Sequence, residues 1–403
     1  MRILLLSTFD FNGAGKAAYK IYDALKNEGI DCEHKVLITD RDKISIKKKF
    51  LKFSNRFKNK FESLIYRFEK KEFNEYNSLS LFPTFEARKI NNSDFDIIHL
   101  TWINDYINIE DLGKISKPIV WSLCDMWPIS GANHYDDYSE KAFWKEKNFS
   151  THNFKILSID KWVIKRKINA WKNNINFVAP GNWIYNCAKE SVITNEFPIH
   201  KIPWPINRNI FNKKNKVEMK KKYGLPSEKK IVVFNSFSGI YNFRKGWDLF
   251  LKSTKLTEND YDIMVIGNTS SADFYKDTKK KIHWMGKFNN DSKMAELINC
   301  GDIFILPSRL DNLPQSGLEA QSCGLPIVSF NTNGLKDLID HKINGFLSEP
   351  FNPISLAEGI DWVFKNLDDL SNNSIEKAVQ SWDAKLVATK YKKLYENLLS
   401  KIS

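Results

Sequence analysis

The chain has 403 residues, of which 42% are hydrophobic and 27% charged, and a formal net charge of +13 at pH 7. This length suggests two domains at roughly 100–200 residues each, with enough apolar residues for sizeable cores. The five cysteines form no C-x-x-C pair and have no histidine cluster beside them, which argues against a disulfide framework or a zinc site and fits a reducing compartment.

No run approaches the ~20 apolar residues of a membrane span, and the apolar run in MRILLLSTF is too short for a signal peptide. We therefore expect a cytoplasmic protein, with attachment to a membrane surface left open. The positive charge is either spread over solvated faces or attracts anionic partners such as nucleotides, phosphates, nucleic acid or anionic lipid.

Apolar runs and amphipathic stretches alternate in the first two-fifths of the chain, which predicts a parallel doubly wound sheet. The expected helix is AAYKIYDALKNEG (17–29), and the expected strands are ILLLST (3–8), DCEHKVLI (31–38), FDIIHLTWI (95–103), KPIVWSLCD (117–125), INFVAP (175–180) and HKIPWP (200–205).

Residues 43–76 interrupt this alternation. Their apolar residues recur at helical spacing, and twelve Lys and Arg against three acidic residues lie between Arg41 and Lys71. A basic amphipathic helix with aromatic residues can lie on an anionic bilayer, and a helix packed on its own domain is the alternative. A second basic stretch, KWVIKRKINAWK (161–172), favours the membrane interpretation slightly.

A second α/β series begins near Lys229, after a polar, Lys-rich segment (205–228) that we interpret as a linker. Its expected strands are KKIVVFNSF (229–237), YDIMVIGN (261–268), KIHWMG (281–286), GDIFILPS (301–308), LPIVSF (325–330) and GFLS (345–348). Two Rossmann-like halves make a cleft between them the expected ligand site. We therefore predict domains at 1–204 and 205–380, with a final helical segment at 381–403.

Gly13 and Gly15 lie in the turn between the first expected strand and the first expected helix. A P-loop is excluded because Ala17 stands where a hydroxyl residue is needed. A dinucleotide-binding turn, with Glu33 as the ribose-binding acid, is weakened by the loose turn expected after Thr8. A turn without a ligand and a helix start that binds phosphate or carboxylate both remain open.

Residues 307–330, PSRLDNLPQSGLEAQSCGLPIVSF, are the most informative stretch. A strand is expected to end at Leu306, which places Asp311 at the carboxyl edge of the sheet. Glu319 follows about a turn into a helix that starts near Gln315 or Ser316. The two carboxylates can accept hydrogen bonds from sugar hydroxyls, and the N–H groups at the helix start suit a diphosphate.

This D-x7-E arrangement resembles the E-x7-E region of the retaining nucleotide-sugar glycosyltransferases of family 4, which have the GT-B fold. The resemblance extends over nearly the whole chain, through NGAGKAAYKIYDALKNEGID, WSLCDMWPISGANHY, FVAPGNWIYNCAKES, IPWPINRNIF, NFRKGWDLFLKS and the final SWDAKLVATKYKKLYENLLSKI. It implies an α/β fold of two facing Rossmann-like domains and a helix that returns to the first domain.

The resemblance also implies residue roles. Lys245 and Arg244 would neutralise the donor diphosphate, Glu319 would bind the nucleotide ribose, and Asp311 would hold the donor sugar. Further donor contacts would come from Asn312, Leu313, Gln315, Ser316, Lys287, Cys124, Gly13, Gly15 and Lys16, and the catalytic set would be Asp125, Lys245 and Asp311. The implied reaction moves a sugar from a nucleotide-diphosphate sugar to a glycan or lipid-linked acceptor in surface polysaccharide synthesis. Neither a cofactor nor a metal is expected.

Several residues depart from the family pattern. Cys124 replaces the histidine of the family's HD pair, Asp311 replaces a glutamate, Gly181 fills a position usually held by serine, and Gly239 falls near a usual arginine. A catalytically silent, glycosyltransferase-like binding protein is therefore an alternative. An NAD(P)-dependent oxidoreductase and a nucleic-acid-binding protein are weaker ones.

Some other motifs invite a functional interpretation. Asp94-Phe95-Asp96 spells the metal-binding D-x-D motif but precedes a strand, at the wrong edge of a parallel sheet. His99 and His134 are expected to be structural or to line a substrate. Trp121, Trp127 and Tyr135 either stack a sugar or belong to the core.

Overall fold

The structure is a computed structural model that describes residues 1–11, 13–39, 62, 64–65, 77–149, 158–172, 174–237, 239–268 and 278–401. The chain divides into two compact units: unit 1 comprises Met1–Pro203 and Ala388–Ser403, and unit 2 comprises Trp204–Val387. The basic amphipathic segment expected at 43–76 lies outside the described residues, except for Glu62, Leu64 and Ile65.

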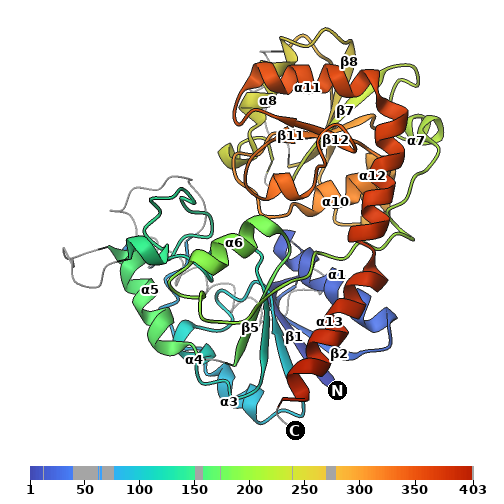
Figure 1. The fold of residues 1–403 in the computed structure, drawn as a ribbon. Coiled ribbons are helices and arrows are strands. Elements are labelled where there is room, and N and C mark those ends of the chain that lie inside the picture. The colour runs from blue at the N-terminus through green and yellow to red at the C-terminus, as the bar shows by residue number, and fades with distance from the viewer. Residues whose placement is uncertain are drawn as a thin grey trace. The chain divides into compact units, whose positions relative to one another are not determined.

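Unit 1 contains a six-stranded parallel sheet in the order β2-β1-β3-β4-β5-β6 (Figure 1). Its strands are β1 (Arg2–Phe9), β2 (Asp31–Ile38), β3 (Ile97–Leu100), β4 (Ile119–Ser122), β5 (Ile175–Ala179) and β6 (Ile199–Lys201). The central strands β3, β4 and β5 are buried along their whole length. This explains why most of their residues are apolar, because a parallel sheet is covered on both faces.

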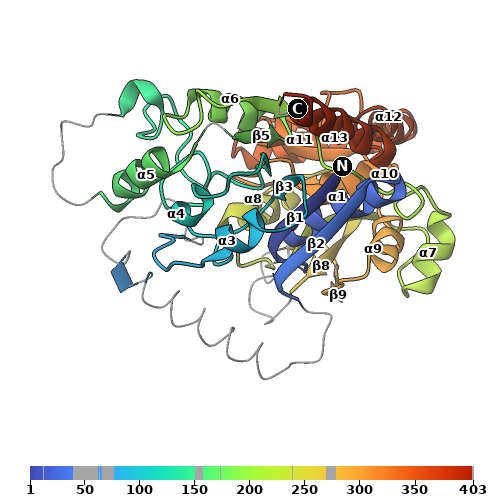
Figure 2. The same cartoon turned by 90° about the horizontal axis from the view of Figure 1, so that it is seen from below.

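The helices of unit 1 include α1 (Gly13–Asn27), α3 (Glu86–Asn91), α4 (Ile109–Leu112), α5 (Ile159–Ala170) and α6 (Asn182–Glu190). Helix α1 packs on β1 and β2, whereas α3, α4 and α5 lie side by side (Figures 1 and 2).

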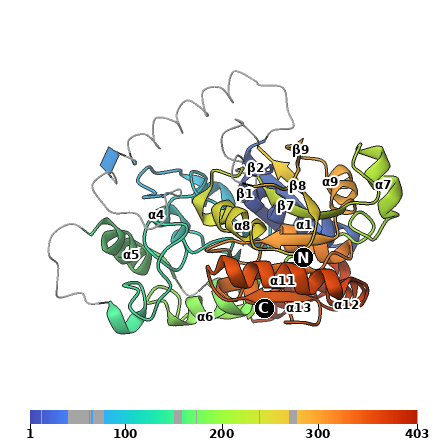
Figure 3. The same ribbon diagram turned by 90° about the horizontal axis from the view of Figure 1, so that it is seen from above.

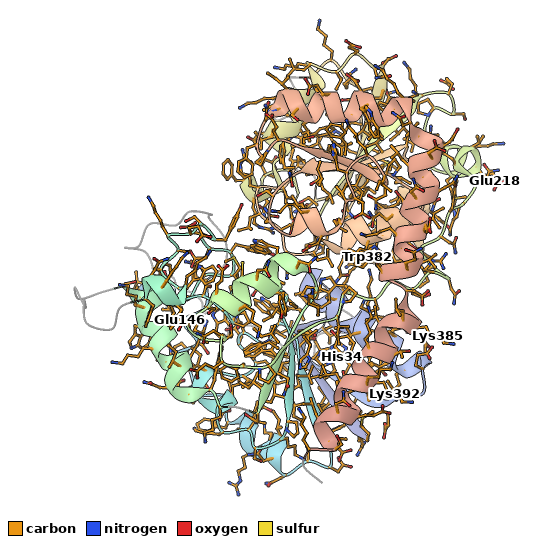
Figure 4. All side chains as sticks on the ribbon, viewed as in Figure 1. His34, Glu146, Glu218, Trp382, Lys385 and Lys392 are labelled. Atoms are coloured by element: carbon orange, nitrogen blue, oxygen red, sulfur yellow. The ribbon has the colours of Figure 1, made fainter. Side chains whose placement is uncertain are left out.

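Helix α13 (Ala384–Leu399) is the last helix of the described chain and packs into unit 1 through two buried tyrosines. The hydroxyl of Tyr395 lies 2.7 Å from His99 Nδ1, and that of Tyr391 lies 2.8 Å from Ser122 Oγ. Lys385 and Lys392 are exposed on the same helix (Figure 4). Burial lowers the pKa of His99 to about 3, so this histidine is a neutral, structural residue.

Unit 2 contains a second six-stranded parallel sheet, in the order β12-β11-β10-β7-β8-β9. Its strands are β7 (Lys230–Ser236), β8 (Tyr261–Gly267), β9 (Ile282–Gly286), β10 (Ile303–Leu306), β11 (Ile327–Phe330) and β12 (Gly345–Ser348). Helices α8 (Trp247–Thr254) and α11 (Pro353–Lys365) pack together, as do α10 (Gln315–Ser322) and α12 (Leu367–Ser381) (Figure 1).

The linker interpretation of 205–228 is wrong, because this segment belongs to unit 2 and contains helix α7 (Lys216–Lys222). The side chain of Asn215 caps this helix by accepting hydrogen bonds from the backbone N–H groups of Val217 and Glu218. Lys222 and Tyr223 both bind Glu296 of α9 (Asp291–Ile298), which lies beside α7 (Figure 3).

The two parallel sheets confirm the predicted α/β fold class. Within the described part of the chain, no helix combines the length and the apolar character needed to cross a membrane.

Candidate functional site

The predicted site residues follow the carboxyl ends of strands, where open parallel sheets bind ligands. Each sheet has one place where successive connections run in opposite directions: between β1 and β3 in unit 1, and between β7 and β10 in unit 2. Such a switch point opens a crevice at the carboxyl edge. Arg244 and Lys245 follow β7 and Asp311 follows β10, so these three residues flank the switch point of unit 2.

Asp311 binds both cations. Its Oδ2 lies 2.7 Å from Lys245 Nζ, and its Oδ1 accepts a hydrogen bond of 3.1 Å from Arg244 Nη1. Asp311 and Arg244 are buried, whereas Lys245 is partly exposed. Burial alone would raise the pKa of Asp311, but Lys245 and Arg244 outweigh it and hold this pKa below its ordinary value. The carboxylate is therefore ionised at neutral pH, in a cluster with a net charge of +1.

The backbone around this cluster is tightly constrained. Gly246 follows Lys245 with φ +69°, and a Cβ there would lie 1.8 Å from the carbonyl oxygen of Pro307. Only glycine allows this approach without displacing one of the two loops. The loops are further joined by Arg309, whose backbone N–H donates to the Arg244 carbonyl and whose guanidinium binds Asp248 with both Nη atoms.

Arg309, Asp248 and Asn333 were missed by the sequence analysis. Asn333 Oδ1 accepts a hydrogen bond from the backbone N–H of Asp311, and its Nδ2 donates to the Arg309 carbonyl. The Asn-Gly pair that follows β11 is a turn signal that draws attention to this position.

Helix α10 begins at Gln315, as predicted, and carries Glu319 in its second turn. Gln315 and Ser316 are partly exposed at its start, whereas Glu319, Asn312 and Leu313 are buried. Lys287 directly follows β9 and is exposed, with its Nζ 3.7 Å from the centre of the Phe237 ring.

In unit 1, Gly13, Gly15 and Lys16 form the first turn of α1. The expectation that the preceding strand ends at Thr8 is wrong: β1 reaches Phe9, which shortens the connection to residues 10–12. A Cβ on Gly15 would lie 2.5 Å from the Phe9 carbonyl oxygen, whereas one on Gly13 would meet no atom within 4 Å. Gly15 therefore has a packing role, because it lets α1 approach β1 closely.

Asp125 follows β4 and accepts three hydrogen bonds. Its Oδ2 lies 2.9 Å from Trp102 Nε1 and 2.5 Å from His134 Nδ1, and its Oδ1 accepts from the backbone N–H of Trp127. The other ring nitrogen of His134, Nε2, lies 2.6 Å from Asn104 Nδ2. These contacts fix the orientation of Asp125, and its catalytic role stays a prediction.

Cys124 is partly buried beside Asp125. Burial raises the pKa of its thiol well above the ordinary value, and the Asp125 carboxylate raises it further. The thiol is therefore protonated at neutral pH and is a weak hydrogen-bonding group.

The structure gives the remaining candidates structural roles. Trp121 and Trp127 are buried in the core of unit 1. Asp94 and Asp96 precede β3. Asp94 pairs with the guanidinium of Arg2, and Asp96 accepts a hydrogen bond from the backbone N–H of Arg2. Glu33 lies near the amino end of β2, with its Oε1 2.7 Å from Arg2 Nη2, so it is at the wrong edge to bind a ribose. This finding argues against the oxidoreductase alternative.

Residues 215–381 match the family model described as Glycosyl transferases group 1. The chain is 25% identical over 196 residues to an uncharacterized glycosyltransferase of Methanocaldococcus jannaschii, covering 45% of this chain and 48% of that protein. It is 27% identical over 167 residues to N,N'-diacetylbacillosaminyl-diphospho-undecaprenol alpha-1,3-N-acetylgalactosaminyltransferase of Campylobacter jejuni, covering 40% and 43% of the two proteins. The chain thus spans about half the length of the curated relatives it matches.

Two solved structures share the fold over nearly the full chain. Sucrose-phosphate synthase of Thermosynechococcus elongatus superposes with a TM-score of 0.68 at 13% identity, covering 100% of both chains. HepE of Anabaena in complex with UDP-glucose superposes with a TM-score of 0.64 at 13% identity, covering 98% of this chain and 100% of that one. These likenesses agree with the predicted GT-B fold, and residues 215–381 of unit 2 match the Glycosyl transferases group 1 model, in agreement with the predicted enzyme class.

Proposed function

We propose that this protein is a retaining glycosyltransferase that moves a sugar from a nucleoside-diphosphate sugar to a hydroxyl of a glycan or lipid-linked acceptor in surface polysaccharide synthesis. The observation that carries the proposal is the Arg244, Lys245 and Asp311 cluster at the switch point of unit 2, inside the segment that matches the family model. The relatives support it, because one is crystallised with UDP-glucose and another is named for a diphospho-undecaprenol acceptor.

In the proposed reaction, the bond between the anomeric carbon and the diphosphate oxygen breaks and its electron pair stays on the diphosphate. The acceptor oxygen bonds to the anomeric carbon on the face that the diphosphate leaves, and the acceptor proton passes to the leaving oxygen. Lys245 and Arg244 neutralise the charge that develops on the diphosphate, in place of a metal ion. Glu319 binds the ribose, and Gln315 and Ser316 offer backbone N–H groups to the phosphates.

We also propose that unit 1 makes peripheral contact with an anionic membrane at the cytoplasmic face. Helix α5 exposes Trp162 and Ile168 alongside Lys165, a combination of apolar and cationic side chains that suits an anionic lipid surface. Flotation with vesicles that contain phosphatidylglycerol should recover the protein, and Trp162→Ala with Lys165→Glu should reduce the bound fraction. Equal binding to purely phosphatidylcholine vesicles would contradict an electrostatic surface.

The test of the main proposal is donor turnover. Release of nucleoside diphosphate from a panel of nucleotide sugars should be slow without acceptor and should disappear in Lys245→Ala. Lys252→Ala, an exposed lysine on α8, is the control and should behave as wild type. If no nucleotide sugar is turned over but a nucleoside diphosphate still binds, the alternative of a silent binding protein is favoured. Cys124 motivates this alternative, and Cys124→His should then restore no activity.

A further inference from the structure

The loop that carries Asp311 is held from two sides. The Asp311 carboxylate contacts Arg244 and Lys245, which follow β7. The main chain of Asp311 contacts Asn333 and Gly334, which follow β11. Strands β7 and β11 are both neighbours of β10, so the three loops meet at the carboxyl edge of one sheet. The loop after β11 thus holds the backbone of Asp311 and leaves the carboxylate to the two cations.

The side chain of Asn333 uses both ends of its amide. Its Oδ1 accepts a hydrogen bond of 3.2 Å from the backbone N–H of Asp311, and its Nδ2 donates one of 2.9 Å to the Arg309 carbonyl. Asn333 is only 2% exposed, so both bonds are sheltered from water. An aspartate would lack the donor, and a glycine would lack both groups. The amide therefore fixes two points of the Asp311 loop at once.

The backbone at residues 333 and 334 is equally constrained. Asn333 has φ +38°, in the left-handed region, where asparagine is one of the better tolerated residues other than glycine. Gly334 donates its N–H to the Asp311 carbonyl at 3.1 Å. A Cβ on Gly334 would lie 1.3 Å from the carbonyl oxygen of Asn312, so only glycine allows this close approach. Both backbone polar groups of Asp311 are therefore bonded to the Asn-Gly pair.

These contacts decide what happens to Asp311 when a diphosphate binds. Lys245 Nζ, 2.7 Å from Asp311 Oδ2, has to give up this contact to pair with a phosphate. A carboxylate on a loosely held loop would follow the ammonium group and compete with the phosphate for it. Because the backbone of Asp311 is fixed from β11, its carboxylate stays in place beside Arg244. Its Oδ2 then loses a donor and can accept a hydrogen bond from a ligand hydroxyl instead.

We propose that Asn333 is a positioning residue, which keeps the Asp311 carboxylate in place while Lys245 exchanges this carboxylate for the donor diphosphate. The inference rests on the proposed function, because the diphosphate and the sugar hydroxyls belong to the donor. Asn333 is buried and acts on the donor only through Asp311, so its effect on diphosphate binding depends on the charge of Asp311.

Amide hydrogen exchange tests the positioning of the loop without any ligand. Replacing Asn333 by glycine keeps the left-handed backbone available and removes both side-chain hydrogen bonds. Exchange of the Asp311 amide, followed by mass spectrometry of overlapping peptides, should be about three- to tenfold faster in Asn333→Gly, as expected for a lost hydrogen bond. Lys342→Gly is the matched control, because Lys342 is an exposed residue of the same unit with φ +62°. Its exchange at Asp311 should equal that of wild type.

Calorimetric titration with UDP, GDP, ADP and CDP tests the consequence for binding. For the diphosphate that binds wild type most tightly, Asn333→Gly should weaken binding about three- to tenfold, because the released carboxylate follows Lys245. The same substitution in an Asp311→Asn background should leave the affinity unchanged, because no competing charge remains. If Asn333→Gly does not fold, Asn333→Ser replaces it with the same expected results, since one hydroxyl cannot bridge both backbone groups.

Three results overturn the proposal. They are unchanged exchange at Asp311 in Asn333→Gly, unchanged diphosphate affinity in that variant, and an equal loss of affinity with and without the Asp311 charge, which is a purely structural effect. Each of these leaves the proposed function standing as long as a diphosphate binds the wild-type protein. If none of the four diphosphates binds wild type, the proposed function fails, and the role of Asn333 in it fails too.

Discussion

Replacing Asp311 by asparagine tests the charge cluster of unit 2 directly. The substitution keeps the size of the side chain but removes the charge that Arg244 and Lys245 share. Removing one partner of a buried ion pair costs about 3–5 kcal/mol. Lys245 is 19% exposed and can turn toward solvent, so we expect the lower end, about 3 kcal/mol. For a unit of this size that loss lowers the Tm by roughly 6–12 °C.

The same variant should bind a nucleoside diphosphate more tightly. In the structure, Lys245 Nζ is 2.7 Å from Asp311, and it must give up this contact to pair with a phosphate. Without the competing carboxylate, affinity for the preferred diphosphate should rise about tenfold, which corresponds to ~1.4 kcal/mol. Sugar transfer should nevertheless fall, because the carboxylate proposed to hold the donor sugar is absent. Calorimetric titration measures the affinity for the diphosphate, and an assay of product release measures sugar transfer.

The pH dependence provides a further check. The pKa of Asp311 is lowered in the folded state, so its contribution to stability is complete above its unfolded pKa of about 3.9 and is lost as pH falls through the folded value. The stability difference between wild type and Asp311→Asn should therefore be constant near neutral pH and shrink below about pH 4.

Asp340→Asn is the control, because Asp340 pairs with Lys377 at the surface of the same unit and should change stability little. Two results would refute the reasoning. One is a stability difference between wild type and Asp311→Asn that stays the same in acid, and the other is weaker diphosphate binding in Asp311→Asn.

Three other substitutions have defined outcomes. Gly15→Ala should destabilise unit 1 by about 1–3 kcal/mol, because the added Cβ clashes with β1. Gly13→Ala should be neutral or slightly stabilising, because a Cβ there meets no atom. Denaturant unfolding measures the free energy of unfolding of both variants. Gly246→Ala should lower both the Tm and the affinity for diphosphates, since it separates the two loops of the charge cluster, and a normal affinity would contradict that account. Lys167→Met should cost about 3 kcal/mol, because the buried Nζ of Lys167 donates to the carbonyls of residues 127, 130 and 131. Lys165→Met, at an exposed position of the same helix, should cost under about 0.5 kcal/mol.

The sheet strands and the start of α10 were predictable because their signals are local. Buried parallel strands such as β10 read as uninterrupted apolar runs, and the loop that follows must lie at the carboxyl edge. Helix α7 was missed because its sequence, KVEMKKK, has little apolar periodicity. Its stability depends on the Asn215 cap and on Lys216 and Lys220, which both contact Asp302 across the fold.

Contacts between distant residues could not be predicted. Asp311 and Lys245 are 66 residues apart, and their pairing depends on the fold that makes β7 and β10 neighbours. Trp102 and Trp121 both lie in apolar stretches that were expected to be strands, yet Trp121 is buried and Trp102 is partly exposed. The difference arises because Trp121 lies inside β4 whereas Trp102 lies beyond the end of β3, and a sequence pattern locates such ends to within a few residues.

The two switch points have different chemistry, and this difference bears on how a transferase of this kind divides its substrates. At the switch point of unit 2, two cations share one carboxylate, which leaves positive charge for a diphosphate. At that of unit 1, the rings of Phe9 and Trp102 are partly exposed, and Asp125 already accepts hydrogen bonds from Trp102 and His134. In the proposed function, this positive charge at the first switch point neutralises the leaving diphosphate.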